Sequence, residues 1–276
     1  DDDDDTITTG SGDDIIIFDG TDGLHDGDII SMGAGTDTIQ MKNSAAFTGV
    51  ADLDEMTGVE KFVTTDVDGA ATSSGEAVSL TFADVDETTT NAITVDASGI
   101  TDSNDDVTVD ASNNDETATT FTITGGAGAD ILTGGDGIDT ISGGAGIDTI
   151  DGDAGADIID GGAGNDILDG GTGNDTITGG AGNDIIATSA GNDIVDGGAG
   201  NDVITAGAGT QSLTGGAGND TFAMGANQTS LDTLAGGDGT DTATMSAATV
   251  DIDFTLATGI EAVTAGTAGT FTLGSL

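Results

Sequence analysis

An aspartate recurs every nine residues through the middle of this 276-residue chain, with glycines at fixed positions around it. Eleven contiguous nine-residue units run from 125 to 223, and each is close to GGxGxDxUx, where U is a large apolar residue. Glycines let the backbone turn tightly and expose its carbonyl oxygens, and the aspartate adds a carboxylate. Such a loop offers little besides oxygen, which suits Ca²⁺ because that ion takes about six to eight oxygen ligands.

The candidate metal ligands are the residues at the sixth position of each unit. Within 125–223 this residue is Asp in ten units, and Gln211 is the exception. Degenerate units stand at 9–17, 23–31 and 32–40, and one more unit follows at 236–244. The predicted ligands are therefore Asp130, Asp139, Asp148, Asp157, Asp166, Asp175, Asp184, Asp193, Asp202 and Asp220 in the contiguous block, and Asp14, Asp28, Asp37 and Asp241 in the flanking units.

A single unit has too few apolar side chains to fold alone, so the units must stack. Positions seven to nine are expected to form a short strand that points the apolar eighth residue inward, and glycines at positions one, two and four to take positive φ. Two units complete one coil, which places residues eighteen apart above one another at about the 4.8 Å strand spacing. The predicted fold is all-β: a parallel β-roll or β-solenoid of nonapeptide repeats with interspersed β segments that bind no calcium.

The unit GGxGxDxUx resembles the nonapeptide of the RTX (repeats-in-toxin) calcium-binding β-roll family. In that family a calcium ion lies between loops stacked on one edge. The resemblance implies five sites on a first edge, and three sites plus one weakened by Gln211 on a second edge. We expect about eight or nine ions in 125–223 and some in the flanking repeats, with the first edge filling more tightly. The first-edge loops begin at 125, 143, 161, 179, 197 and 215, and the second-edge loops at 134, 152, 170, 188 and 206.

Residues 41–124 contain no GGxGxD and instead alternate apolar with polar residues, a pattern of half-buried strands. Either a calcium-poor β-solenoid or a small β-sandwich, continuous with the roll, fits this pattern. The near copies 92–100 and 106–114, fourteen residues apart, are expected to be successive rungs. The predicted domains are degenerate repeats at 1–40, this β segment at 41–124, the roll at 125–244, and the start of the next β segment at 245–276.

A longer repeat links the two ends of the chain. Asp37 aligns with Asp241 at an offset of 204 residues (37 to 241), and the Gly-Val-Glu at 58–60 aligns with the Gly-Ile-Glu at 259–261, an offset of 201 residues (58 to 259). We interpret this as slightly more than one period of a super-repeat of roughly 200 residues. The chain is accordingly expected to be a fragment of a longer protein.

The composition fits calcium chelation better than general acidity. The net charge is −49, yet only six acidic residues are Glu, and short Asp side chains suit tight turns and chelating loops. Stacked carboxylates without metal repel one another, so the metal-free chain is expected to be largely disordered. The alternative, an acidic surface adapted to high salt, would use Glu freely. Without cysteine, metal ions take the place of disulfides as cross-links.

Several function classes find little support. Lys42 and Lys61 are the only basic residues besides His25, so a nucleic-acid patch is excluded, and no apolar run predicts membrane insertion. A catalytic triad needs a histidine, and His25 lies in a degenerate loop. There is no HExxH motif, and carboxylates beside glycine loops indicate chelation rather than a glycosidase pair. We predict that this chain is not an enzyme.

Three functions remain. The chain resembles type-I-secreted bacterial surface-layer proteins, which implies an extracellular calcium-binding structural protein whose copies assemble into a lattice or filament. The alternatives are an extender region of a giant RTX adhesin and the calcium-folded secretion tail of an exported enzyme or toxin. The super-repeat and the flanking β segments favour the first two, since a secretion tail usually has one repeat block near its C-terminus.

Overall fold

The computed structural model describes residues 6–19, 29–42, 51–52, 61–65, 77–82, 92–114, 117–225, 232–245 and 257–265. It contains two compact units, residues 1–146 and 147–276, each described below by itself. All strand pairs given for these ranges are parallel, and the predicted all-β roll is confirmed. Among the described residues, no helix is long and apolar enough to cross a membrane.

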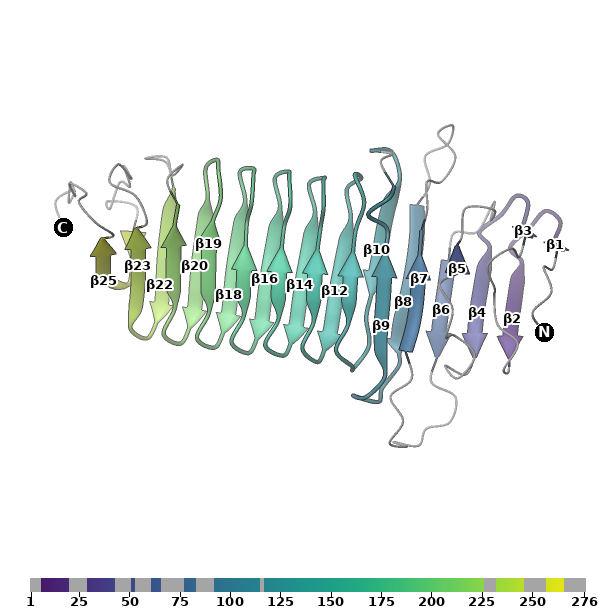
Figure 1. Ribbon diagram of the computed structural model, residues 1–276, viewed down its shortest axis with the longest axis horizontal. Coiled ribbons are helices and arrows are strands. Elements are labelled where there is room, and N and C mark those ends of the chain that lie inside the picture. Colours follow the sequence, from purple (N-terminus) through teal and green to yellow (C-terminus); the bar gives the residue numbers. More distant parts are fainter. Residues whose placement is uncertain are drawn as a thin grey trace. The chain divides into compact units, whose positions relative to one another are not determined.

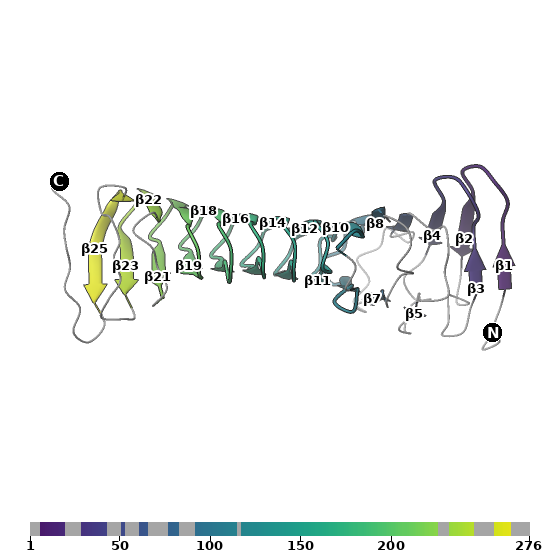
Figure 2. The same cartoon turned by 90° about the horizontal axis from the view of Figure 1, so that it is seen from above.

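Unit 2 (147–276) is a stack of coils, each with one strand in either of two parallel sheets (Figures 1 and 2). Ile158 pairs with Thr176 and Thr176 with Ile194, so the predicted eighteen-residue coil is confirmed. The spacing lengthens to 21 residues where Ser212 pairs with Thr233. The long-strand sheet contains β14 (Ile158–Ala163), β16 (Thr176–Ala181), β18 (Ile194–Ala199), β20 (Ser212–Ala217), β22 (Thr233–Asp238) and β24 (Ala257–Thr258). The short-strand sheet contains β13 (Thr149–Asp151), β15 (Ile167–Asp169), β17 (Ile185–Ala187), β19 (Val203–Ala206), β21 (Thr221–Met224), β23 (Asp241–Met245) and β25 (Ile260–Ala265).

The core of unit 2 lies between its two sheets and consists mainly of the apolar residues at position eight. These side chains are at most 1 % exposed, and alternate residues of each strand face outward. Most strands therefore bury only one large side chain, although β21 buries both Phe222 and Met224, and stability depends on stacking rather than on a deep core. The position-eight core residues are Ile150, Ile159, Leu168, Ile177, Ile186, Val195, Ile204, Leu213, Phe222 and Leu234.

Unit 1 (1–146) also consists of parallel strands stacked in two sheets, but its coils vary in length. Strands pair at an offset of 23 residues near the start (Ile15 with Thr38) and at 28 residues further on (Thr120 with Ala92). The larger sheet contains β2 (Ile15–Asp19), β4 (Thr38–Lys42), β6 (Lys61–Thr65), β8 (Ala92–Gly99), β10 (Thr120–Thr124) and β12 (Thr140–Ala145). The smaller sheet contains β5 (Ala51–Asp52), β7 (Ala77–Thr81), β9 (Asp106–Asp110) and β11 (Ile131–Thr133), and β1 (Thr6–Thr8) pairs separately with β3 (Ile29–Ser31).

Parallel stacking within unit 1 supports a solenoid rather than a sandwich for the described parts of 41–124. The alternating apolar residues of this segment are buried, and Phe82 contacts Phe62 and Phe121 edge-on, with ring centroids 5.5 and 5.3 Å apart. These rings fill coils that are longer than those of the nonapeptide block.

The prediction that the near copies at 92–100 and 106–114 are successive rungs is wrong. They form β8 and β9, which belong to different sheets and therefore make the two halves of one coil. Their neighbours within each sheet come from elsewhere: β8 pairs with β10, and β9 with β11. The shared pattern reflects a shared need to bury alternate residues against the same core.

Candidate metal sites on two carboxylate ladders

The loops that begin at 179, 197 and 215 depend on glycine at positions two and four for two reasons. In the loop that begins at 179, Gly180 has φ of +106° and Gly182 of +145°, which side chains other than glycine rarely adopt. A methyl group on Gly180 or Gly182 would also collide with the carbonyl oxygen of Gly162 or Gly164, one coil earlier. The second and fourth carbonyls of one loop therefore point at the next loop.

The glycine at position one has a different role from the predicted one, because it does not have positive φ. A methyl group on Gly161 would lie 2.6 Å from the carbonyl oxygen of Gly179 and 2.8 Å from Oδ2 of Asp166. Glycine is needed here because a carboxylate oxygen and a carbonyl oxygen converge on the space that a Cβ would fill.

The two edges of unit 2 differ in backbone structure, in line with the difference in their sequences. Loops of the first edge extend the long strands, so that Gly162 pairs with Gly180 and Ala163 with Ala181. Loops of the second edge are joined by isolated bridges at 154, 172, 190 and 208. On this edge Asp153 and Ser189 take φ of +66° and +50°, although neither is glycine.

The sixth-position aspartates of the first edge form a continuous chain of hydrogen bonds, the first carboxylate ladder. The backbone N–H of each aspartate donates to Oδ1 of the aspartate one coil later, at 2.8–2.9 Å. All of these aspartates are at most 1 % exposed. The ladder runs through Asp148, Asp166, Asp184, Asp202, Asp220 and Asp241, and it ends at Glu261, whose Oε2 accepts from Asp241 N–H at 2.8 Å.

The second edge has an equivalent second carboxylate ladder, which is interrupted once. Asp157 donates to Asp175 and Asp175 to Asp193, at 2.9 and 3.0 Å. Asp193 N–H then donates to Oε1 of Gln211 at 3.2 Å, while Nε2 of Gln211 donates to the carbonyl oxygen of Gly191 at 3.0 Å. The ladder resumes because Gln211 N–H donates to Oδ1 of Asp232 at 2.9 Å.

Asp232 and Glu261 are ladder members that the nonapeptide pattern did not predict. Asp232 is fully buried and is followed by Thr233 and Leu234, so its D-x-U spacing gave a usable signal even though no glycines precede it. Glu261 had no such signal, because it lies in a segment without the nonapeptide.

Unit 1 contains shorter versions of the same arrangement. Asp14 N–H donates to Oδ1 of Asp37 at 2.8 Å, so the degenerate loops at 9–17 and 32–40 stack. Asp130 and Asp139 accept bonds from Val107 and Phe121 N–H, each at 2.7 Å. Their Oδ2 atoms also accept from amides of their own loops, Gly126 N–H at 2.7 Å and Gly135 N–H at 2.9 Å. Asp28, the remaining predicted ligand, lies outside the described residues.

The ladders leave one oxygen of most carboxylates unsatisfied. Among the described residues no hydrogen-bond donor reaches the buried Oδ2 atoms of Asp166, Asp175, Asp184, Asp202, Asp220 or Asp241. A buried carboxylate oxygen without a partner is costly, and a cation would remove that cost. The described residues contain no cluster of three or more His, Cys, Asp or Glu side chains that could hold a metal ion by themselves. Carbonyl oxygens must therefore supply the other ligands, and Ca²⁺ accepts both kinds of oxygen.

Burial and mutual repulsion act on the proton affinity of these groups. The pKa values of Asp175 and Asp202 are raised to about 6, mainly by desolvation and in part by neighbouring carboxylates. Burial likewise raises the pKa of Asp166, Asp184 and Asp220. Like charges in low dielectric favour the neutral form, unless a cation compensates them.

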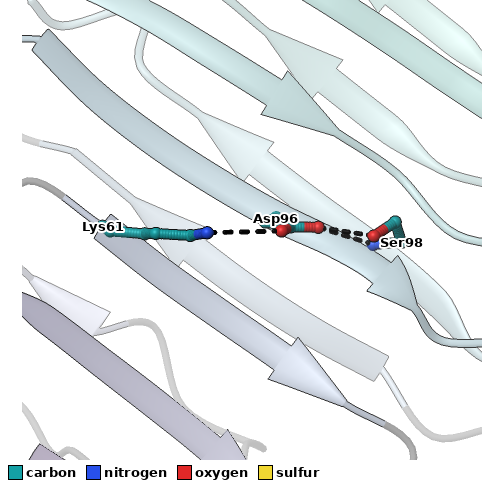
Figure 3. A network of polar contacts seen from close by, with 3 residues as sticks. All are labelled: Lys61, Asp96 and Ser98. Carbon is teal, nitrogen blue, oxygen red and sulfur yellow. Dashed lines mark hydrogen bonds and ion pairs between the residues drawn. The ribbon is translucent and has the colours of Figure 1, made fainter. Parts of the chain in front are cut away.

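Lys61 shows by contrast how a carboxylate outside the ladders is stabilised (Figure 3). Oδ1 of Asp96 accepts from the Ser98 hydroxyl at 2.6 Å and from Ser98 N–H at 3.2 Å, and Nζ of Lys61 lies 3.6 Å from Oδ2. The Ser98 hydroxyl and amide, with Lys61, lower the pKa of Asp96 against the opposing effect of burial. Lys61 is the only lysine whose side chain the structure describes, so within that part no protein cation remains for the ladders.

Asparagines at position five form a further ladder that the motif did not predict. Asn183 N–H donates to Oδ1 of Asn165 at 2.6 Å, and Asn201 and Asn219 continue the series at 2.7 Å each. On the second edge Asn192 N–H donates to Oδ1 of Asn174 at 2.8 Å. These bonds run from each loop back to the previous one, opposite in direction to the Asp bonds, and so fix the loops from both sides.

Together the two-sheet parallel roll and its turns, lined with carboxylate and carbonyl oxygens, define a β-roll of the metal-binding kind. A comparison with protein-family models finds the RTX calcium-binding nonapeptide repeat (four copies), with matches at 122–141, 133–168, 160–195, 169–204 and 188–222. Residues 122–222 are thus RTX calcium-binding nonapeptide repeats, a type that binds calcium and is typical of secreted extracellular proteins. A search of the curated proteins found no match for the chain.

Proposed function

We propose that the chain is part of an extracellular structural protein, of the surface-layer type, in which Ca²⁺ drives both folding and self-assembly. The observation that carries the proposal is the pair of ladders, which bury carboxylates with no compensating side-chain cation among the described residues. The residues that would hold calcium are the predicted aspartates, now joined by Asp232, with carbonyl oxygens of the same loops. Bound calcium would supply positive charge between the coils.

We expect eight ions in the contiguous repeats, the lower figure of the predicted range of about eight or nine. The six loops of the first edge form five neighbouring pairs, and we expect one ion for each pair. The five loops of the second edge form four pairs, of which the pair that contains Gln211 is left out, so three ions are expected there. Gln211 removes one site because its Nε2 already satisfies the Gly191 carbonyl oxygen. An anomalous-scattering map with most of its ions on the second edge would contradict this assignment.

Export before folding agrees with the chemistry of the chain. Extracellular calcium modules bind at about 10⁻⁴ to 10⁻³ M, far above cytosolic calcium levels. A chain with net charge −49 would stay unfolded at low calcium and fold after it leaves the cell. Type I secretion of an unfolded chain fits this sequence of events, and a structural rather than catalytic role fits the composition.

Self-assembly needs a surface on which two strongly negative molecules can meet. Between β17 and β23 the outward residues of the short-strand sheet include no carboxylate; we call this the uncharged face. Ile185 and Val203 are adjacent on it and 52 % and 39 % exposed. A second copy of the chain is the partner that suits it, because other surfaces would repel a copy unless calcium bridged them. The uncharged face consists of Ile185, Ala187, Val203, Thr205, Thr221, Ala223, Thr242 and Thr244.

The test is electron microscopy of the purified chain with millimolar calcium, comparing the unaltered protein with Ile185→Glu and Ile194→Glu. Ile194 is 57 % exposed but lies on the long-strand sheet beside Asp196, so it is the matched control. We expect sheets or filaments from the unaltered protein and from Ile194→Glu, and none from Ile185→Glu. A chain that folds with calcium but stays monomeric would contradict self-assembly and favour the adhesin extender or the secretion tail.

A further inference from the structure

The first carboxylate ladder continues beyond the stretch that matches the RTX repeat, which ends at residue 222. Its last two steps use the loop at 236–241 and then Gly259-Ile260-Glu261, a short segment without the nonapeptide motif. These three residues form part of the longer repeat, since the same Gly-apolar-Glu pattern occurs at 58–60.

Glu261 occupies the place that an aspartate takes elsewhere in the ladder. Its Oε2 accepts the N–H of Asp241 at 2.8 Å, the same bond that Asp241 Oδ1 makes to Asp220 N–H at 2.8 Å. Strand pairing shifts register at this point: Asp241 pairs with Ile260 and Thr242 with Ala262. The shift leaves Glu261 opposite the end of the loop, where the longer glutamate side chain reaches the amide.

Gly259 takes the place of the first glycine of a regular loop. A methyl group on Gly236 would collide with the carbonyl oxygen of Gly259 and with Oδ2 of Asp241, the pair of atoms that converges at Gly161 and at Gly197 in the regular loops. Unlike the first glycine of a regular loop, Gly259 has positive φ (+69°), a conformation that favours glycine. Asp241 is fully buried, and within the described residues its Oδ2 has no hydrogen-bond partner.

We propose that Asp241, Glu261 and the Gly259 carbonyl complete a further calcium site that closes the first edge of the roll. The proposal rests on calcium binding by the ladders, as proposed above. Glu261 is exposed, so water can complete the coordination shell of the ion. A Gly-apolar-Glu segment is thus the final rung of a calcium ladder.

The test is the number of calcium ions bound by the whole 276-residue chain, measured by equilibrium dialysis against calcium alone. Glu261→Gln keeps an oxygen that accepts the Asp241 amide but removes the charge, and Asp238→Asn removes a charge from an exposed side chain of the same loop. We expect Glu261→Gln to bind one ion fewer than the unaltered chain at half-saturating calcium, or to bind that ion at least tenfold more weakly. Asp238→Asn should bind the full number.

Equal calcium binding by Glu261→Gln and the unaltered chain would overturn this inference, because Glu261 would then be only a hydrogen-bond acceptor. Calcium binding by the remaining ladders would in that case stand. If the unaltered chain bound no calcium, the proposed function would fail together with the inference. Circular dichroism of each variant in saturating calcium shows whether a lost ion reflects a lost fold.

Discussion

At the scale of single residues, the nonapeptide has glycine at positions where a side chain would collide with neighbouring oxygen atoms. Gly182 combines positive φ with direct contact to the Gly164 carbonyl, whereas Gly161 leaves room for a carboxylate and a carbonyl oxygen. The glycines of the motif therefore meet two physical requirements: the loops must stack tightly, and a space enclosed by oxygen atoms must stay open. At position two, Asp153 and Ser189 take positive φ although neither is glycine, which strains the backbone.

Ser189 is the residue where this strain can be measured. Its φ of +50° costs a non-glycine residue about 1 kcal/mol, a cost that glycine escapes. Ser189 also donates to Oδ1 of Asp169 at 2.7 Å, so Ser189→Ala is the matched control that loses the hydroxyl but keeps the strain. We expect Ser189→Gly to be more stable than Ser189→Ala by about 1 kcal/mol in thermal unfolding with calcium. Equal stability of the two variants would mean that the loop relaxes to another conformation.

At the scale of loops and strands, Gln211 takes the place that we propose for a metal ion at the other steps of the ladder. Its carboxamide accepts from Asp193 N–H and donates to the Gly191 carbonyl oxygen, and it has no charge. These two hydrogen bonds join the loops of the second edge at this step, so our proposal requires no calcium ion there. Thr188, which replaces the first glycine of the loop, reinforces it by accepting a bond from Gly207 N–H at 2.9 Å.

Gln211→Asp should convert this step into a calcium site. The shorter carboxylate restores the oxygen-only ladder and withdraws the amide donor from Gly191. We expect isothermal titration to show one more calcium ion per chain, and the metal-free form to lose stability through added repulsion. Gln211→Asn, which shortens the side chain without adding charge, should leave the ion count unchanged. An unchanged count for Gln211→Asp would contradict the view that Gln211 prevents metal binding at this step.

Sequence periodicity was sufficient for the regular coils but not for their ends. The nine-residue spacing predicted the eighteen-residue pairing of Ile158 with Thr176 because identical units can stack only in register. The spacing predicted the same environment for Asp130 and Asp166. However, Asp130 Oδ2 accepts a hydrogen bond from an amide of its own loop, whereas no donor among the described residues reaches Asp166 Oδ2. This difference in hydrogen bonding depends on which segment of the chain stacks against the loop. Glu261 was missed for the same reason, since its role depends on a register shift.

At the scale of the whole molecule, the charge of the ladders couples folding to protons as well as to calcium. The pKa of Asp175 and Asp202 rises from 3.8 in the unfolded chain to about 6 in the folded one. A raised folded pKa means that the folded chain binds protons more tightly, so acid stabilises the metal-free fold. This stabilisation is complete below pH 3.8 and is lost as the pH rises through about 6.

Metal-free protein should therefore have more β-structure near pH 5 than near pH 8, as measured by circular dichroism in excess chelator. With calcium the trend should reverse, because the ion requires deprotonated carboxylates and its affinity falls below about pH 6. A metal-free spectrum that is the same at both pH values would contradict the view that buried carboxylates oppose folding.

The most direct test of the central claim, that calcium folds the chain by neutralising two buried carboxylate ladders, is a calcium titration followed by circular dichroism at neutral pH. We predict little β-structure in chelator and a cooperative gain at about 10⁻⁴ to 10⁻³ M calcium. Magnesium should not substitute, because it demands a smaller and more regular octahedral shell. A chain that folds equally well in excess chelator would contradict the account, since the ladders would then be stable without a cation.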